Sequence, residues 1–168
     1  MPLVSGPVFQ ICWVVEDIDA SERWFTENLG VPSWFRIPDV HFGPDACTLR
    51  GEPADFQIHV SLGWAGDQQL ELIQPVAGDS LYREHLDRCG EGLHHIAYAP
   101  DDFDAAVDEA KLAGIPISQH GSFTGSGISF AYLDGSAGGA PHIELIGLDD
   151  DAKAFFAHLK KESVAAAG

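Results

Sequence analysis

The stretch QICWVVEDIDA, residues Gln10–Ala20, decides the fold because a second stretch, HIAYAPDDFDA at His95–Ala105, repeats its pattern. Each reads as a strand, an acidic helix cap and the beginning of a helix. A glycine and then a proline follow each helical segment, so we expect helices over residues 19–29 and 103–113. Internal similarity of this kind predicts two copies of one structural unit.

The remainder of each copy reads as three strands. The matching segments LELI (Leu70–Ile73) and IELI (Ile143–Ile146) close the two copies. Residues 56–62 and 128–133, which precede them, are rich in apolar and β-branched residues and end in turn-forming sequences. Each copy has room for one further strand after its helix. The sequence therefore predicts an α+β fold made of two tandem βαβββ modules.

The chain is expected to form one domain over residues 1–168, because 168 residues suit a single hydrophobic core. Residues 80–88 read as a short helix, and residues 150–161 as an amphipathic helix followed by a fraying Ala-rich tail. We divide the chain into a first module, a connector, a second module and a C-terminal helix with its tail, over residues 7–75, 76–91, 92–148 and 149–168.

Charge and cysteine content narrow the function. Nine Lys and Arg against 26 Asp and Glu give a net charge of −17, which disfavours nucleic acid and anionic membranes as partners. The three widely spaced cysteines predict neither a disulfide framework nor a zinc knuckle. No apolar run is long enough for a membrane span, and no signal peptide is evident. A cytoplasmic location is expected.

Four polar residues interrupt otherwise apolar strands: Gln10, Glu71, His95 and Glu144. Each copy supplies one of them near the start of its first strand and one carboxylate in its last. Taken singly, a strand glutamate commonly faces solvent and a lone Gln or His is commonly a hydrogen-bonded core residue. Two buried carboxylates at equivalent places need positive charge, however, and a divalent metal ion would satisfy all four side chains.

Over residues 8–147 the chain resembles the vicinal oxygen chelate superfamily, which includes glyoxalase I, methylmalonyl-CoA epimerase, extradiol dioxygenases and bleomycin-resistance proteins. LELIQP (70–75) and GLHHIAY (92–98) are the most specific segments. The resemblance implies an open, cup-shaped mixed sheet with helices on its outer face, a metal ion inside and a homodimer. It places the metal ligands at Gln10, Glu71, His95 and Glu144, a set similar to that of zinc-binding glyoxalase I. Zn²⁺ is therefore expected first, with Co, Ni, Mn or Mg as alternatives.

Some positions depart from individual branches of that superfamily. Val14 and Glu91–Gly92 stand where glyoxalase I has arginines for glutathione. The strand over residues 56–62 has no counterpart of the second catalytic glutamate of the epimerase, and His59 or Gln57 would stand nearest. A dioxygenase needs two His and one carboxylate for ferrous iron, so Gln10 and Glu71 argue against oxygen chemistry.

The chemistry that suits such a site is proton transfer next to a carbonyl group, as in an isomerase, epimerase or lyase. Glu144 is the first candidate base and His59 the second. Cys12 would line the cavity near the metal. A metal-free protein that binds a small molecule is the alternative, and a dioxygenase is ranked last.

The expected substrate is a small hydrophobic or acyl-type carbonyl compound. Trp13 should pack under the first helix. Residues 121–127 have the composition of a mobile loop at the mouth of a cup. Several aromatic side chains in loops or near strand ends could surround the substrate or pack in the core and at a dimer interface: Trp34, Phe35, Phe42, Trp64 and Phe123.

Overall fold

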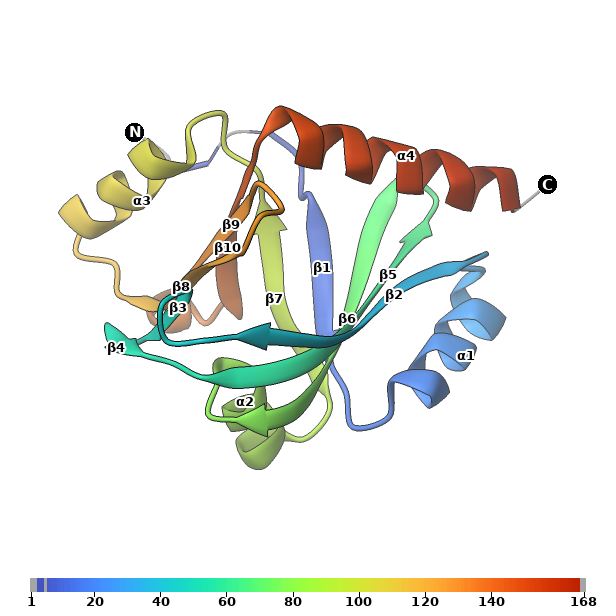
Figure 1. The fold of residues 1–168 in the computed structure, drawn as a ribbon, viewed down its shortest axis with the longest axis horizontal. Coiled ribbons are helices and arrows are strands. Elements are labelled where there is room, and N and C mark those ends of the chain that lie inside the picture. Colours follow the sequence, from blue (N-terminus) through green and yellow to red (C-terminus); the bar gives the residue numbers. More distant parts are fainter. Residues whose placement is uncertain (1–2, 5, 167–168) are drawn as a thin grey trace.

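The computed structural model describes residues 3–4 and 6–166. One sheet of ten strands curls around a central space, with its strands in the order β2-β5-β6-β1-β7-β10-β9-β8-β3-β4 (Figure 1). The strands of the first half are β1 (Gln10–Val14), β2 (Trp34–Phe42), β3 (Cys47–Leu49), β4 (Glu52–Pro53), β5 (Phe56–Ala65) and β6 (Gln68–Gly78). Those of the second half are β7 (Gly92–Tyr98), β8 (Ile117–Phe123), β9 (Ile128–Leu133) and β10 (His142–Leu148).

Four α-helices accompany the sheet: α1 (Ile18–Leu29), α2 (Leu81–Cys89), α3 (Phe103–Leu112) and α4 (Asp150–Ala166), with one 3₁₀ turn over Ser136–Gly138. The predicted α+β class is confirmed. Within residues 3–4 and 6–166, none of these helices is long and apolar enough to cross a membrane.

The internal repeat appears in the sheet as two halves that meet at its centre. β1 and β7, the first strands of the two copies, pair antiparallel to each other. β1 also pairs parallel with β6, and β7 pairs parallel with β10. The four strands that carry the polar residues singled out above are therefore neighbours, in the order β6-β1-β7-β10. This adjacency brings side chains from both copies to one place.

The repeated caps fix the beginnings of α1 and α3. Asp17 and Asp102 each accept a hydrogen bond at 2.9 Å from the backbone N–H three residues ahead. Gly30, at the end of α1, adopts φ 69°, a left-handed conformation that only glycine reaches without strain. Both helices agree with the predicted ranges to within one residue at either end.

The parity of β1 predicts its two faces correctly. Ile11 and Trp13 lie on the outer face and pack with Phe25 of α1. Cys12 and Val14 lie on the inner face, in the largest core cluster. α3 packs in the same way over the outer face of the second half, through Ala106, Val107 and Ala110.

The structure differs from the predictions in the segment between α1 and β5. It forms a nine-residue strand, β2, and then a short hairpin, β3–β4, which leaves the first half of the sheet and pairs with β8 at the far edge. The chain therefore passes, between residues 43 and 46, from β2 at one edge of the sheet to β3 near the other edge. Strands of two and three residues carry too little periodicity to be predicted from sequence.

Two further expectations need correction. Residues 121–123, predicted as part of a mobile loop, belong to strand β8, because they pair with β9 and with Cys47 of β3. The C-terminal helix does not stop at residue 161 but continues to Ala166, since alanine favours the helix. Residues 167 and 168 of the predicted tail lie outside the described part of the chain.

Helix α4 lies across the opening of the cup (Figure 1). Phe156 packs edge-on against Phe9, and Phe155 against Phe35 of β2, with ring centroids 5.6 and 5.5 Å apart. Asp149 caps the helix by accepting a hydrogen bond from the backbone N–H of Ala152 at 2.8 Å. The cap also joins α4 to the β8–β9 turn, because the backbone N–H of Asp149 donates to the carbonyl oxygen of Gly127 at 3.0 Å.

The Gly127→Ala substitution is expected to loosen α4. A Cβ atom at this residue would overlap the carboxylate of Asp149, and the φ of +70° adds backbone strain. Gly125→Ala is the matched control, since its φ is +74° but a Cβ atom there meets nothing within 4 Å. Gly127→Ala should lower the free energy of unfolding by about 1–2 kcal/mol more than the control. Equal losses in urea denaturation would contradict this role for the cap.

Candidate functional site

A cavity of about 640 Å³ occupies the inside of the cup, between the sheet and α4. Its walls are mostly apolar, and three of its polar side chains, Gln10, Glu71 and Glu144, come from the four central strands. The aromatic side chains that line it come from β2, α2, β8, β9 and α4: Phe35, Phe42, Tyr82, Phe123, Phe130, Tyr132, Phe155 and Phe156.

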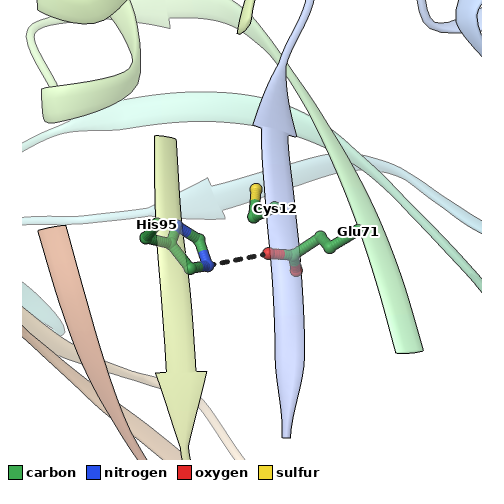
Figure 2. Close-up of side chains that lie close together, drawn as sticks. All are labelled: Cys12, Glu71 and His95. Carbon is green, nitrogen blue, oxygen red and sulfur yellow. Dashed lines mark ion pairs between the residues drawn. The ribbon is translucent and has the colours of Figure 1, made fainter. Parts of the chain in front are cut away.

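His95 is the centre of the polar end. Its side chain is fully buried on β7, and its Nε2 atom lies 3.4 Å from Oε2 of Glu71 and 3.2 Å from Oε2 of Glu144. Figure 2 shows the ring of His95 turned toward the Glu71 carboxylate. The two carboxylates come from β6 and β10, the last strands of the two copies. The structure thus brings these three predicted residues together.

Gln10, the fourth predicted residue, lines the same cavity and is 2% exposed. Its amide Nε2 donates a 2.7 Å hydrogen bond to Oε1 of Gln69, the residue that faces it across the β1–β6 pair. This bond fixes the amide group and orients it. Gln69 is a residue that the sequence analysis missed, although the alternation along β6 places it on the same face as Glu71.

A β-bulge explains why both histidines of the pair are buried. Cys12 pairs with His95 but Trp13 pairs with Leu93, so His94 is the extra residue of β7. The bulge leaves both imidazoles inside, with Nδ1 of His94 2.9 Å from Nδ1 of His95.

Burial and charge compete in setting the protonation of the site. Burial alone would lower the pKa of His95, but the carboxylates of Glu144 and Glu71 overcome it and raise the pKa to about 9. Burial raises the pKa of Glu144 above its ordinary value, although the His95 imidazole acts in the opposite direction. Without a metal ion, a proton on His95 is therefore the positive charge that the two carboxylates share.

Stability of the metal-free protein should fall between about pH 7 and pH 8.5. The pKa of His95 is raised from about 6.5, so its contribution is complete below that pH and is lost as the pH rises toward 9. The raised pKa of Glu144 has the same sign, but its loss begins as the pH rises above the ordinary value of 4.5. Burial lowers the pKa values of His85, His94 and His142, so their titration changes stability at a lower pH than this window.

Urea denaturation at pH 7 and at pH 8.5, in the presence of a chelator, checks this expectation. A His95→Gln variant should show a flatter dependence between pH 7 and pH 8.5, because it lacks the imidazole whose pKa is raised to about 9. A slope that is the same in both proteins would show that other groups govern it.

The distances from His95 to the two carboxylates are compatible with a shared divalent cation. Nε2 of His95 and Oε2 of Glu144 are buried and have no hydrogen-bond partner among the described residues. Two atoms that each lie about 2.1 Å from one ion are about 3.0–3.4 Å apart at angles of about 90–109°. The contacts of His95 with Glu71 and Glu144 fall in this range. One imidazole with carboxylate and amide oxygens is a donor set that suits a borderline or hard divalent ion.

Cys12 also lies at this place. Its sulfur, the Glu71 carboxylate and the His95 imidazole offer ligand atoms within 4.8 Å of one another (Figure 2). Burial and the nearby Glu71 carboxylate raise the pKa of its thiol well above the ordinary value. In the metal-free protein the buried thiol therefore favours its protonated form and is a poor nucleophile, because a nucleophile would need an accessible thiolate.

His59 is not part of the site. It lies on β5 between Ile58 and Val60, which line the cavity, so its own side chain points to the opposite face. There its Nδ1 accepts a hydrogen bond of 3.0 Å from the backbone N–H of Asp39. The structure therefore does not bring His59 together with the other predicted site residues.

The aromatic predictions divide in two. Phe35, Phe42 and Phe123 line the cavity, whereas Trp34 and Trp64 pack in the core. Sequence reasoning missed the aromatic side chains of α4. The apolar stripe formed by Ala152, Phe156 and Leu159 indicated a buried face but not what it covers.

A curled sheet built from two βαβββ repeats, with polar residues of four central strands at the base of an apolar cavity, defines a class of protein. Residues 9–132 match the family model described as the Glyoxalase/Bleomycin resistance protein/Dioxygenase superfamily. The chain belongs to this superfamily, and the predicted resemblance is confirmed.

Solved structures agree on the fold. Methylmalonyl-CoA epimerase from Mycobacterium tuberculosis is 20% identical, with a TM-score of 0.65 over 90% of this chain and 93% of that one. A hypothetical protein from Bacillus halodurans is 17% identical, with a TM-score of 0.63 over 86% of this chain and 95% of that one. A Streptomyces coelicolor methylmalonyl-CoA epimerase variant in complex with 2-nitronate-propionyl-CoA is 19% identical, with a TM-score of 0.59 over 84% and 96%.

One curated relative is similar over a shorter stretch. The uncharacterized protein YqjC of Bacillus subtilis is 43% identical over 42 residues, which are 25% of this chain and 30% of that protein. The match spans less than a third of that relative.

Proposed function

We propose that the protein is a metal-dependent enzyme that moves a proton next to a carbonyl group, as an isomerase, epimerase or lyase. One observation carries the proposal: Nε2 of His95 is buried, has no hydrogen-bond partner among the described residues, and lies 3.4 and 3.2 Å from the carboxylates of Glu71 and Glu144, which line a large apolar cavity. Gln10, Glu71, His95 and Glu144 would hold the ion. A divalent ion there, with Zn²⁺ expected first, would supply a Lewis acid for the negative charge that develops on the substrate oxygen.

Glu144 is the base in this proposal. Burial raises the pKa of its carboxyl group, so its carboxylate accepts a proton more readily than an exposed glutamate does. Its carboxylate also borders the cavity, where a bound substrate would lie. Gln69 holds the amide of Gln10, while the apolar walls exclude water and strengthen electrostatic effects inside.

The substrate class follows from the charges at the cavity. Arg36 and His41 line it, but each is already paired with acidic residues: Arg36 with Asp19 and Glu22, and His41 with Asp55. Few cationic groups remain for a phosphate or carboxylate substituent. A neutral hydrophobic carbonyl compound therefore fits better than an acyl-CoA, which the structural neighbours bind.

A metal-free protein that binds a small molecule remains the second candidate, and the size and aromatic lining of the cavity favour it. A dioxygenase fits less well, because the ligand set has a single histidine. Homodimer formation and a cytoplasmic location stay predictions.

Deuterium exchange separates the two candidates. Purified protein is analysed for bound metal, stripped with a chelator and incubated in D₂O with 1,3-diketones, α-branched ketones or methylmalonyl-CoA. Exchange at the α-carbon that needs Zn²⁺ supports the enzyme. Tight binding of the same compounds by the stripped protein, without exchange in either state, would support the binding protein instead.

A further inference from the structure

A second pocket has a volume of about 380 Å³ and is lined in part by α2. Helix α2 lies on the side of the sheet opposite α4 (Figure 1). It is lined by α2, by the beginnings of β7 and β10, and by the 134–141 loop. Although the chain is strongly acidic, basic and imidazole side chains gather here: Arg50, His85, Arg88, His94 and His142.

His94 is the buried group that faces this pocket. Its side chain is 1% exposed, and its Nε2 atom makes no hydrogen bond of ordinary length and angle among the described residues, although the backbone of Leu81 is close enough to raise the pKa of the ring. A buried imidazole nitrogen without a partner is unfavourable, which points to a ligand that completes it. The Nδ1 atom of His142, also buried and unpartnered, belongs to the same pocket.

The contact between the two histidines decides what His94 offers to a ligand. Their Nδ1 atoms are 2.9 Å apart, so one hydrogen atom lies between them. If His95 holds a metal through Nε2, as the proposed function requires, its Nδ1 carries that hydrogen and donates it to His94. Neutral His94 then carries its own hydrogen on Nε2, which makes it a donor into the pocket.

The charges around the pocket fit a ligand that accepts hydrogen bonds. Arg88 forms no ion pair within the described part of the chain, and Ser118 and Ser136 add hydroxyl groups. Arg50 donates two hydrogen bonds of 2.7 Å to the Glu84 carboxylate. This carboxylate is therefore already neutralised and does not compete with a bound anion for the other cationic groups of the pocket. Asp134 is the other acidic group, and it accepts from the backbone N–H of Ser136.

We propose that this pocket is a second binding site for a small oxyanion, a carboxylate or a phosphate group, held by Nε2–H of His94 and the guanidinium of Arg88. Its link to the metal site through the His94–His95 contact rests on the proposed function. An oxyanion on His94 would make Nδ1 a better acceptor and so strengthen His95 as a ligand. The coupling is reciprocal.

Calorimetric titration of the metal-free protein with phosphate and with acetate tests the site and distinguishes its two ligand types. Arg88→Gln should weaken binding by about fivefold or more, because a charge-assisted hydrogen bond is lost. Lys161→Gln, which removes one positive charge from the exposed side of α4, should stay within about twofold of the wild type. A ¹⁵N spectrum of the histidine rings in Zn²⁺-loaded protein should show His94 protonated on Nε2.

Equal phosphate and acetate binding by the wild type and Arg88→Gln would overturn the proposal. So would Zn²⁺ held by His85, His94 and His142 in a Glu71→Gln, Glu144→Gln double variant, since the pocket would then be a metal site. The titrations need no metal ion. A failure of Zn²⁺ to bind at His95 would therefore count against the proposed function and leave the phosphate result standing.

Discussion

Replacing Glu144 with glutamine is expected to slow α-proton exchange by about a hundredfold to ten-thousandfold, which is the range for loss of a general base. Glutamine keeps the size and an oxygen atom for the metal ion but cannot accept the proton. Zn²⁺ should therefore still bind, with an affinity lower by about 10–100-fold. Exchange rates in D₂O at saturating Zn²⁺, followed by proton NMR, measure the effect on chemistry apart from the effect on metal binding.

Asp151→Asn is the matched control for this variant. Asp151 also lines the cavity, but from α4 and away from the His95 cluster. Its substitution removes a carboxylate from the same cavity and should leave exchange almost unchanged. Comparable losses in both variants would indicate that net cavity charge, and not a base at Glu144, controls the rate.

The His95→Gln substitution is expected to have the second large effect, on stability and on metal affinity together. It removes the group that neutralises two buried carboxylates, and breaking such a pair costs about 3–5 kcal/mol. Urea denaturation of the metal-free protein measures this loss. Zn²⁺ affinity, measured by competition with a chelator, should fall by more than about a hundredfold.

A double variant separates repulsion from packing. Adding Glu144→Gln to His95→Gln removes one of the two uncompensated carboxylates, so the double variant should regain part of the lost stability. A double variant that is less stable than His95→Gln would mean that packing around the imidazole, and not charge, accounts for the loss.

Much of the architecture was predictable because the sequence contains two copies of the same structural unit. Two strands followed by acidic caps and helices gave both helix ranges, and the alternation along β1 assigned Ile11 and Cys12 to opposite faces. The same alternation gathered Gln10, Glu71, His95 and Glu144 into one cluster, once the repeats were assumed to form a common sheet. Their role as metal ligands remains a prediction.

Features that depend on distant pairing were not predictable. His59 lies between two residues of β5 that line the cavity, so its side chain points to the opposite face of the sheet. The sequence shows the alternation along the strand but not which of the two faces is turned toward the cavity. The β3–β4 hairpin depends on partners about seventy residues away, which local sequence does not encode. The position of α4 over the cavity is likewise set by Phe9 and Phe35, two residues far from it along the chain.

The path of the β3–β4 hairpin also bears on how such a protein could arise by gene duplication. Although the two repeats are alike, the hairpin of the first completes the outer edge of the second by pairing Cys47–Leu49 with β8. A polypeptide that ends before β7 would contain the hairpin but not β8, the strand with which the hairpin pairs. A polypeptide that begins at β7 would expose the edge of β8. An ancestor with a single repeat would therefore have needed a second copy of itself to cover both edges.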